Sequence, residues 1–199
     1  MLRRHLPLLA LPILSWPAGA IPAVTRFRIM REGSAIGTHT VTLSEAGGAL
    51  TARSEVAVQV KLVGITVFRL THNFTEVWAG DRLRSVTSHH DRNGTVKDMT
   101  ARAEGGAILV QGPEGPLRLP AEAAPLSWWD ARRFDRPLFD SETGKPLRLQ
   151  WTRTPGPGAA TTWRATGDEE GEGQYAADGT WLAWRTKGED GSLVIYERA

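Results

Sequence analysis

Apolar and polar side chains alternate along most of this chain, and short turn signals interrupt the alternation at regular intervals. A two-residue period is typical of β-strands, and helical periodicity is nearly absent. The clearest expected strands span 24–31, 36–44, 50–62 and 65–78. Turn spacing predicts about ten to twelve strands in all. Because hairpin follows hairpin, we expect an all-β fold built as one curved antiparallel meander sheet, either a barrel or a half-barrel.

Two of these strands are expected to form an inner face. The strand over 50–62 aligns one set of side chains by the two-residue period, namely Val56, Val58, Val60 and Leu62. The strand over 65–78 aligns another set, namely Phe68, Leu70, His72, Phe74, Glu76 and Trp78. Side chains two residues apart on a strand share a face, so each set is predicted to point toward the interior.

Asn93-Gly94 is the sharpest local signal, since a two-residue type I′ turn needs positive φ at both positions. This turn predicts that His90 opposes Lys97 and that His89 opposes Asp98. The same reasoning at two further turns, Asp178-Gly179 and Asp190-Gly191, predicts that Tyr175 opposes Leu182 and that Arg185 opposes Tyr196. The chain is therefore expected to end in a three-stranded meander.

The first twenty residues follow the order of an export signal: Arg3-Arg4, an apolar run over 6–16, and Ala18-Gly19-Ala20. The apolar run is too short for a membrane-spanning helix, which needs roughly 20 apolar residues. We therefore expect a signal peptide at 1–20 and a single antiparallel β domain at 21–199. General secretory export and twin-arginine export both fit the paired arginines. The expected location is the periplasm or the exterior of the cell.

Composition excludes several classes of protein. Arg3 and Arg4 belong to the 24 basic residues, so losing them leaves the basic residues equal in number to the 22 acidic ones. With no remaining run of basic residues, a nucleic-acid partner is not expected. The chain has no cysteine, which excludes disulfides, a cysteine-linked lipid anchor and a cysteine nucleophile. No phosphate-loop, dinucleotide or metalloprotease motif occurs, so we expect no cofactor and no metal.

One segment departs from the β pattern. Pro120 and Pro125 are followed by Ser127-Trp128-Trp129-Asp130, which resembles the capping box at the start of a helix. We expect a short helical segment near 127–134, lying over one side of the curved sheet. That position would give Trp128 or Trp129 a buried site.

His72 and Glu76 are the polar members of the aligned set in 65–78. They lie roughly 13 Å apart along the strand, so each needs a partner elsewhere. In one interpretation they are polar contacts in a ligand cavity whose other candidate residues are Phe68, Leu70, Phe74, Trp78, Trp128 and Trp129. In the other they are hydrogen-bonded core residues, or this face is the solvated one.

The predicted His89 and Asp98 pair is the weak catalytic candidate, because a carboxylate at this spacing can orient an imidazole. The alternative is a polar pair on a solvated face, since no third member is identifiable. His90 is expected on the opposite face. Neighbouring strand residues diverge, so His89-His90-Asp91 is not expected to bind a metal.

Trp181 and Trp184 are expected to point to opposite faces of the final meander, which would make both faces partly apolar. Three occupants could cover the second face: the segment carrying Trp128 and Trp129, a second subunit, or an apolar ligand. The sequence leaves the oligomeric state open.

The chain also resembles an uncharacterised family of exported proteobacterial β-proteins, catalogued as a domain of unknown function. The resemblance covers nearly all of the mature chain, and four motifs carry it: Val63-Gly64-Ile65-Thr66-Val67, Thr75-Glu76-Val77-Trp78 with Asp81-Arg82-Leu83, Pro125 through Trp129, and Tyr175-Ala176-Ala177-Asp178-Gly179. It implies a β-sheet protein of the Gram-negative envelope. It brings no catalytic residues.

These observations favour a soluble exported protein that binds or carries an apolar or amphiphilic envelope molecule, because a curved sheet of this size can enclose one small ligand. Two alternatives remain. One is a structural protein that docks a partner through an apolar face. The other is an enzyme acting on envelope material through His89 and Asp98 or through His72 and Glu76. The leading hypothesis is therefore a binding protein without enzymatic activity.

Overall fold

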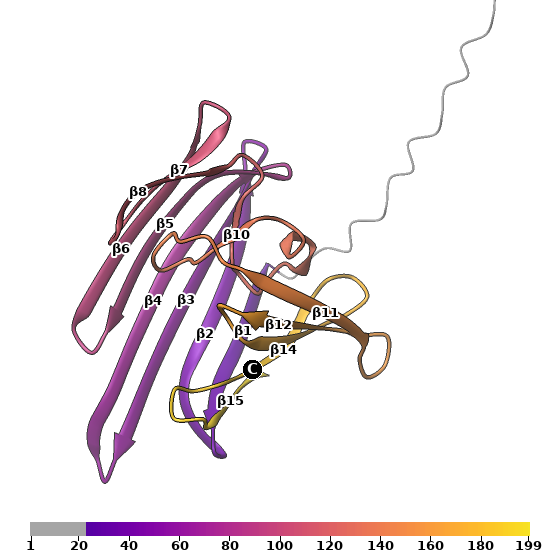
Figure 1. The fold of residues 1–199 in the computed structure, drawn as a ribbon. Coiled ribbons are helices and arrows are strands. Elements are labelled where there is room, and N and C mark those ends of the chain that lie inside the picture. Colours follow the sequence, from indigo (N-terminus) through magenta and orange to yellow (C-terminus); the bar gives the residue numbers. More distant parts are fainter. Residues whose placement is uncertain (1–22) are drawn as a thin grey trace, which may run out of the picture.

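The computed structural model describes residues 23–199, so the signal peptide expected at 1–20 lies outside the described residues. Thirteen strands form one antiparallel sheet in the order β11-β12-β13-β14-β15-β1-β2-β3-β4-β5-β6-β7-β8 (Figure 1). β1 pairs with β15, which brings the two ends of the described chain together. The outermost strands, β8 and β11, do not pair with each other. The predicted all-β meander is confirmed, and of the two predicted forms it takes the open one.

The strands of the large sheet have the following bounds: β1 Val24–Arg31, β2 Ser34–Ala46, β3 Ala49–Leu62, β4 Ile65–Ala79, β5 Arg82–Arg92, β6 Thr95–Glu104, β7 Ala107–Gly112, β8 Gly115–Pro120, β11 Leu149–Pro155, β12 Thr161–Gly167, β13 Gly171–Tyr175, β14 Trp181–Lys187 and β15 Leu193–Arg198. A separate two-stranded parallel ladder pairs β9 (Ala124–Pro125) with β10 (Leu138–Phe139). The large sheet thus has slightly more strands than the turn spacing predicted.

The segment 121–148 connects β8 to β11 and crosses the inner face of the sheet, as Figure 1 shows for its orange-pink chain. We call it the crossing segment. It carries β9, β10 and one 3₁₀ turn at Ala131–Arg133. Asp130 caps this turn, accepting a hydrogen bond from the backbone N–H of Arg132 at 3.2 Å. The helical segment is confirmed, but it is shorter than 127–134 and starts at Asp130 rather than Ser127.

Strand register follows the turn chemistry at the Asn93-Gly94 hairpin, follows it in part at Asp178-Gly179 and departs from it at Asp190-Gly191. His89 opposes Asp98, as predicted from Asn93-Gly94. Tyr175 opposes Trp181 rather than Leu182, and Arg185 opposes Ile195 rather than Tyr196. Both C-terminal connections are five-residue loops, at 176–180 and 188–192, and not two-residue turns. The β14–β15 register is therefore shifted by one residue throughout, whereas the β13–β14 register matches the prediction from Glu172 to Gln174 and shifts only at Tyr175.

An extra residue in β14 also corrects the expected directions of two tryptophans. The β13–β14 register shifts between Gln174 and Tyr175, and Leu182 is the unpaired residue opposite that shift. Such a bulge reverses the alternation locally. Trp181 and Trp184 consequently line the same cavity on the inner face, and the predicted opposite directions are wrong.

The core lies on the inner face between the sheet and the crossing segment. Its buried members come from both, including Trp78, Met99 and Ile108 from the sheet and Trp129 and Phe134 from the crossing segment. The inner face of β3 stays buried only at its β2-paired end. Val56, Val58 and Val60 are half-buried, and Leu62, at the end next to the β3–β4 turn, is 66% exposed. The prediction that all four residues meet the core is therefore wrong at the turn end.

The β3–β4 turn has the same backbone conformation as the Asn93-Gly94 turn but a different residue at its first position. Val63 and Gly64 have φ of 49° and 79°, and Asn93 and Gly94 have φ of 52° and 85°. A β-branched residue at positive φ is strained, whereas Asn tolerates this region. Asn93 is further fixed by the backbone N–H of Arg69, which donates to its Oδ1 at 2.8 Å.

We therefore expect Val63→Asn to stabilise the fold by about 1 kcal/mol, raising the Tm by about 2–4 °C. The reciprocal change, Asn93→Val, should lower the Tm by a larger amount, because it adds strain and removes the bond from Arg69. Differential scanning calorimetry measures both. A Val63→Asn protein no more stable than wild type would show that the turn holds no strain.

Candidate ligand-binding site

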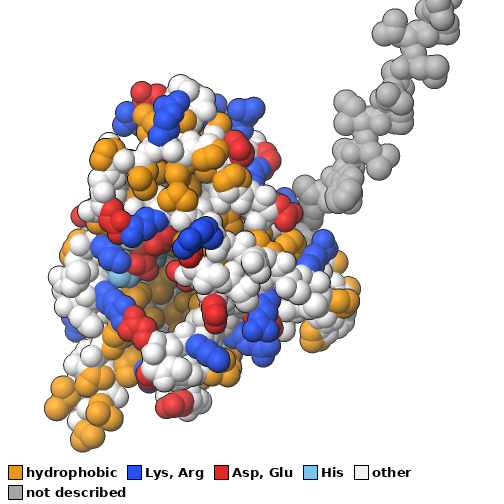
Figure 2. Space-filling view, in the orientation of Figure 1, with side chains coloured by type: hydrophobic (Ala, Val, Ile, Leu, Met, Phe, Trp, Pro, Cys, Tyr) orange, Lys and Arg blue, Asp and Glu red, His pale blue; other side chains and the backbone are white. Residues whose placement is uncertain are grey.

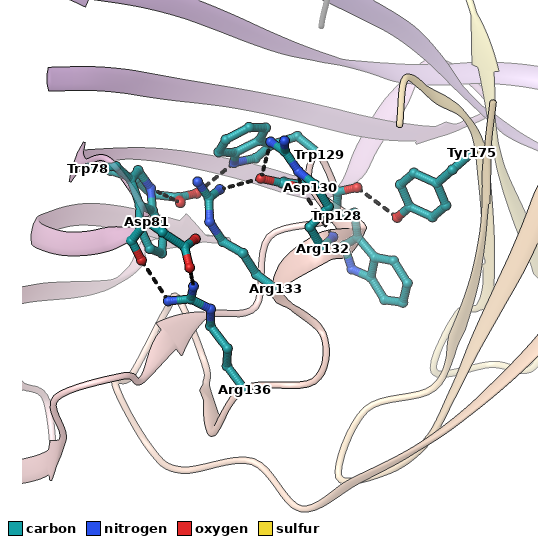
Figure 3. Close-up of polar contacts among 10 residues, drawn as sticks. Trp78, Asp81, Trp128, Trp129, Asp130, Arg132, Arg133, Arg136 and Tyr175 are labelled. Atoms are coloured by element: carbon teal, nitrogen blue, oxygen red, sulfur yellow. Dashed lines mark hydrogen bonds and ion pairs between the residues drawn. The ribbon is translucent and has the colours of Figure 1, made fainter. Parts of the chain in front are cut away.

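A buried arginine fixes the crossing segment against the sheet. The guanidinium carbon of Arg133 lies 3.6 Å from the ring centroid of Trp78 and 4.5 Å from that of Trp129. The indole N–H groups of both tryptophans donate to Glu76, at 2.8 Å from Trp78 and 3.0 Å from Trp129. Arg133 Nη1 also lies 3.0 Å from Asp130 Oδ2. Figure 3 shows these groups stacked between β4 and the crossing segment. We call them the Arg133 cluster.

Burial and charge act against each other in this cluster. Burial raises the pKa of Glu76 above its usual value, and the charge of Arg133 and the indole N–H groups oppose that rise. Burial alone would also raise the pKa of Asp130, but the hydrogen bonds of Arg132 and the charge of Arg133 outweigh it and hold that pKa below its usual value. Such groups are tolerable in the interior only when they are paired. The cluster therefore fixes where the crossing segment lies.

Trp128 and Trp129 connect the crossing segment to two halves of the sheet, one containing β1 to β8 and the other β11 to β15. Trp129 bonds to Glu76 of β4, while Trp128 packs against Trp184 of β14 with ring centroids 5.3 Å apart. The Tyr175 hydroxyl donates to the backbone carbonyl of Trp128 at 2.7 Å (Figure 3). Trp128 and Trp129 therefore lie between the two halves and contact both of them.

The space between the two halves contains a cavity of about 240 Å³. Its walls come from β2, β3, β4, β14, β15, the β12–β13 connection and the crossing segment. The lining residues are His39, Val41, Ser54, Val56, Leu70, His72, Phe74, Leu126, Ser127, Trp128, Trp129, Asp140, Ser141, Glu142, Leu147, Glu169, Trp181, Trp184 and Tyr196. Figure 2 shows a hollow in this face with hydrophobic side chains in its floor and charged side chains around its rim. The site is amphipathic.

Several polar groups in the cavity wall have no hydrogen-bond partner within residues 23–199. They are both ring nitrogens of His39, the hydroxyl of Ser54 and the indole N–H of Trp184. His39 is 7% exposed and Ser54 is 1% exposed. Buried polar groups in proteins are normally hydrogen-bonded, and an unpaired one costs about 1–3 kcal/mol. These side chains therefore bring unpaired polar atoms into the wall of the cavity.

The rim of the cavity is acidic. Asp140, Glu142 and Glu169 all line it, and within the described chain no lining residue is Lys or Arg. Glu142 is partly compensated, because His90 Nε2 and Lys97 Nζ each lie 3.3 Å from one of its oxygens. Burial, and next the charges of Asp140 and Glu142, raise the pKa of Glu169. The rim thus favours a cationic or uncharged group over an anion.

The cavity histidines are neutral near pH 7. Burial, followed by the nearby His72, lowers the pKa of His39 to about 3. Burial and then His90 lower the pKa of His72 to about 4. His72 Nε2 lies 2.9 Å from the Ser88 hydroxyl, and its ring centroid is 5.4 Å from that of His90. These imidazoles serve as hydrogen-bonding groups without charge.

The structure brings together most of the residues that the sequence proposed for a ligand site. Leu70, His72, Phe74, Trp128 and Trp129 line the cavity. Glu76 and Trp78 lie deeper, in the Arg133 cluster, and are fully buried. Phe68 lies outside the cavity lining, where the Arg92 guanidinium carbon is 5.2 Å from its ring centroid. The inward direction expected for His72 and Glu76 agrees with their burial.

The other candidate pair lies away from this cavity. His89 Nδ1 is 2.7 Å from Asp98 Oδ1, as the hairpin register indicated, and the two side chains are 53% and 72% exposed. Neither residue lines the cavity. The arrangement matches a polar pair on a solvated face, and we assign it no catalytic role.

Sequence reasoning missed His39, Ser54 and the acidic rim. His39 and Ser54 lie within the expected strands, but an isolated polar residue at an inward position gives no periodic signal of a cavity. Asp140, Glu142 and Glu169 lie in connections, where acidic residues usually indicate solvated surface. Only the path of the crossing segment brings these groups together.

Fold and site together define a large open antiparallel β-sheet protein whose inner face is crossed by one segment and holds a cavity. A family model described as a domain of unknown function, DUF6134, matches residues 27–199, and the chain belongs to this family. This confirms the resemblance to an uncharacterised family.

Among solved structures, the chain is similar to a crystal structure of a DUF1089 family protein from Pseudomonas aeruginosa. The TM-score is 0.45 at 14% sequence identity, over 71% of this chain and 86% of that one. A comparison with curated proteins found no match. Within residues 23–199, no helix combines the length and apolar character needed to cross a membrane.

The Arg133 cluster predicts unequal roles for two adjacent arginines that both contact Asp130. Arg133→Met should destabilise the fold by about 3–5 kcal/mol, because it leaves buried carboxylates without a counterion. Arg132→Met, whose side chain is 66% exposed, should cost about 1 kcal/mol or less. Urea unfolding followed by tryptophan fluorescence measures the difference. Equal losses would contradict a structural role for the cluster.

The neutral histidines predict a pH dependence of stability. Between pH 6.5 and 4 the unfolded chain binds protons at His39 and His72 that the folded chain does not, so stability falls as the pH falls. Each site contributes up to about 1.4 kcal/mol per pH unit. Urea midpoints at pH 7, 6 and 5 should show a shallower slope for His39→Phe than for wild type. Identical slopes would mean that the pKa of His39 is the same in the folded and unfolded states.

Proposed function

We propose that this protein is an exported binding or carrier module for an amphiphilic molecule of the cell envelope. The observation that carries the proposal is the cavity of about 240 Å³, in which aromatic walls surround polar side chains that no described residue hydrogen-bonds. Ligand sites are typically concave and apolar with a few placed polar groups.

The lining divides into two parts that suit the two ends of an amphiphile. Phe74, Trp181 and Trp184 supply apolar contact area, while His39 and Ser54 supply hydrogen-bonding groups. A hydroxyl or amine of the ligand would pair with His39 and Ser54 and remove the cost of leaving them unpaired. Such a site discriminates strongly against a ligand without a polar group, because that ligand leaves His39 and Ser54 without hydrogen-bond partners.

The charge around the cavity sets the expected head group. Three carboxylates line it, and the described lining offers no cationic side chain to meet an anion. An uncharged or cationic head group is therefore favoured, and a carboxylate or phosphate head group is repelled by the rim.

The same groups support binding rather than catalysis. A general base works best when its pKa lies near the operating pH. With pKa values of about 3 and 4, His39 and His72 are weak proton acceptors near pH 7. The alternative of partner docking through a second apolar face of the C-terminal meander loses its basis, because Trp181 and Trp184 line one cavity.

Export and an envelope location are supported by the order of residues 1–20: paired arginines, a short apolar run, and small residues at positions 18 and 20. An amphiphile of the envelope would then be present in the same compartment as the protein.

A matched ligand series tests the proposal. Octylamine, octanol and octanoate share one tail length and differ in head-group charge, and four cavity tryptophans report binding by fluorescence. We expect octylamine and octanol to bind at least about tenfold more tightly than octanoate. Equal affinities for the three, or no saturable binding, would contradict the proposal.

A pair of variants localises the binding. Ser54→Ala should weaken octylamine and octanol binding by about fivefold to tenfold, since one hydrogen bond is lost. Thr25→Ala is the control, because Thr25 is also buried but does not line the cavity. Equal effects of the two changes would place the ligand elsewhere.

A further inference from the structure

The β3–β4 hairpin projects beyond the rest of the sheet. The last residue of β3 that pairs with β2 is Val58, and the first residue of β4 that pairs with β5 is Leu70. In the β-ladders, residues 59–69 therefore pair only with one another, and Arg69 at their base also exchanges two hydrogen bonds with Asn93 of the β5–β6 turn. At about 3.3 Å per residue, the turn lies about 20 Å beyond Leu70. Figure 1 shows this hairpin extending past its neighbours at the lower left. We call residues 59–69 the projecting tip.

The apex of the projecting tip is apolar and exposed. Leu62 is 66% exposed, Val63 93%, Ile65 70% and Val67 54%. Figure 2 shows the hydrophobic side chains gathered at this corner of the molecule. The other large exposed apolar side chains of residues 23–199, Val96 and Leu193, stand singly on other hairpins. Clustered exposure of this kind indicates an interaction surface, whereas single exposed residues are ordinary.

The charges of the projecting tip have one sign. Residues 59–69 contain Lys61 and Arg69 and no acidic residue. Lys61 directly precedes Leu62 on β3, and Arg69 comes four residues after Ile65 on β4, so the cations lie about 3 and 13 Å from these apex residues toward the base of the hairpin. This order, apolar apex first and basic groups behind, matches the depth profile of a bilayer with anionic head groups.

We propose that the projecting tip docks the protein on an anionic lipid surface, with Leu62, Val63 and Ile65 entering the acyl boundary and Lys61 and Arg69 contacting phosphates. The occupant is a bilayer rather than a second copy of the chain. A narrow two-stranded tip presents little area, while specific protein interfaces bury about 1,200–2,000 Å². A lipid surface accepts an apolar wedge without a matching groove.

The backbone at Val63 agrees with this assignment. Its φ of 49° is costly for a β-branched side chain, yet an apolar residue stands at the most exposed point of the turn. Two other turns of this conformation carry polar residues at the same position, Asn93 in the β5–β6 turn and Glu32 in the β1–β2 turn, so Val63 is the apolar member of the three. The inference does not depend on the cavity, because Leu62, Val63 and Ile65 are absent from its lining.

Because the chain has no cysteine, a single introduced thiol reports on one position. Val63→Cys and the control Val96→Cys, each labelled with the polarity-sensitive dye NBD, are mixed with vesicles of phosphatidylethanolamine and phosphatidylglycerol. We expect a blue shift and a several-fold rise in NBD emission at position 63 and no change at position 96. Lys61→Gln in the position 63 protein should weaken vesicle binding at least about threefold, and added salt should do the same.

Emission at position 63 that stays solvent-like with vesicles would overturn the proposal. So would a blue shift without vesicles that grows with protein concentration, because that result assigns the tip to a second copy. Loss of the vesicle response should leave octylamine binding unchanged, which separates failure of this inference from failure of the proposed ligand site.

Discussion

The sandwiching of Arg133 between Trp78 and Trp129, above Glu76 and beside Asp130, is the interaction on which the rest of the structure depends. Charged groups this deeply buried require specific partners, and a displacement of the chain that separated them would leave a buried charge unpaired. Since the partners come from β4 and from the crossing segment, their pairing fixes that segment across the inner face. The space left between the segment and the two halves of the sheet is the cavity.

Local pattern was sufficient for the strands and insufficient for the site. Alternation predicted β4, and Asn93-Gly94 predicted the register of β5 with β6, because backbone geometry there follows from neighbouring residues. The extra residue Leu182 has no periodic signal, so the directions of Trp181 and Trp184 were wrong. The crossing segment supplies Asp140 and Glu142 of the acidic rim and lies beside Glu169 of the β12–β13 connection, through contacts distant in sequence. Its path depends on a buried ion cluster, which no local period reveals.

Some positions that conflict with local stability coincide with the proposed functional surfaces. His39 and Ser54 are buried without hydrogen bonds from residues 23–199, and Val63 has a backbone conformation that suits Asn or Gly better. Local preference and fold agree at Asn93-Gly94 and in the cap at Asp130, whereas Glu32, at φ 49° in the β1–β2 turn, is a conflict outside both surfaces. Such conflicts are expected where a residue serves a ligand or a surface in place of the fold. In this protein they occur at the proposed amphiphile-binding cavity, in His39 and Ser54, and at the projecting tip, in Val63.

Native mass spectrometry of the protein purified from the cells that produce it tests the central claim most directly. Wild type should carry a reproducible small-molecule adduct that organic extraction removes, and Ser54→Leu, which fills the cavity, should lack it. A wild-type spectrum showing only the mass of the chain, or the same adduct on Ser54→Leu, would contradict binding in the cavity.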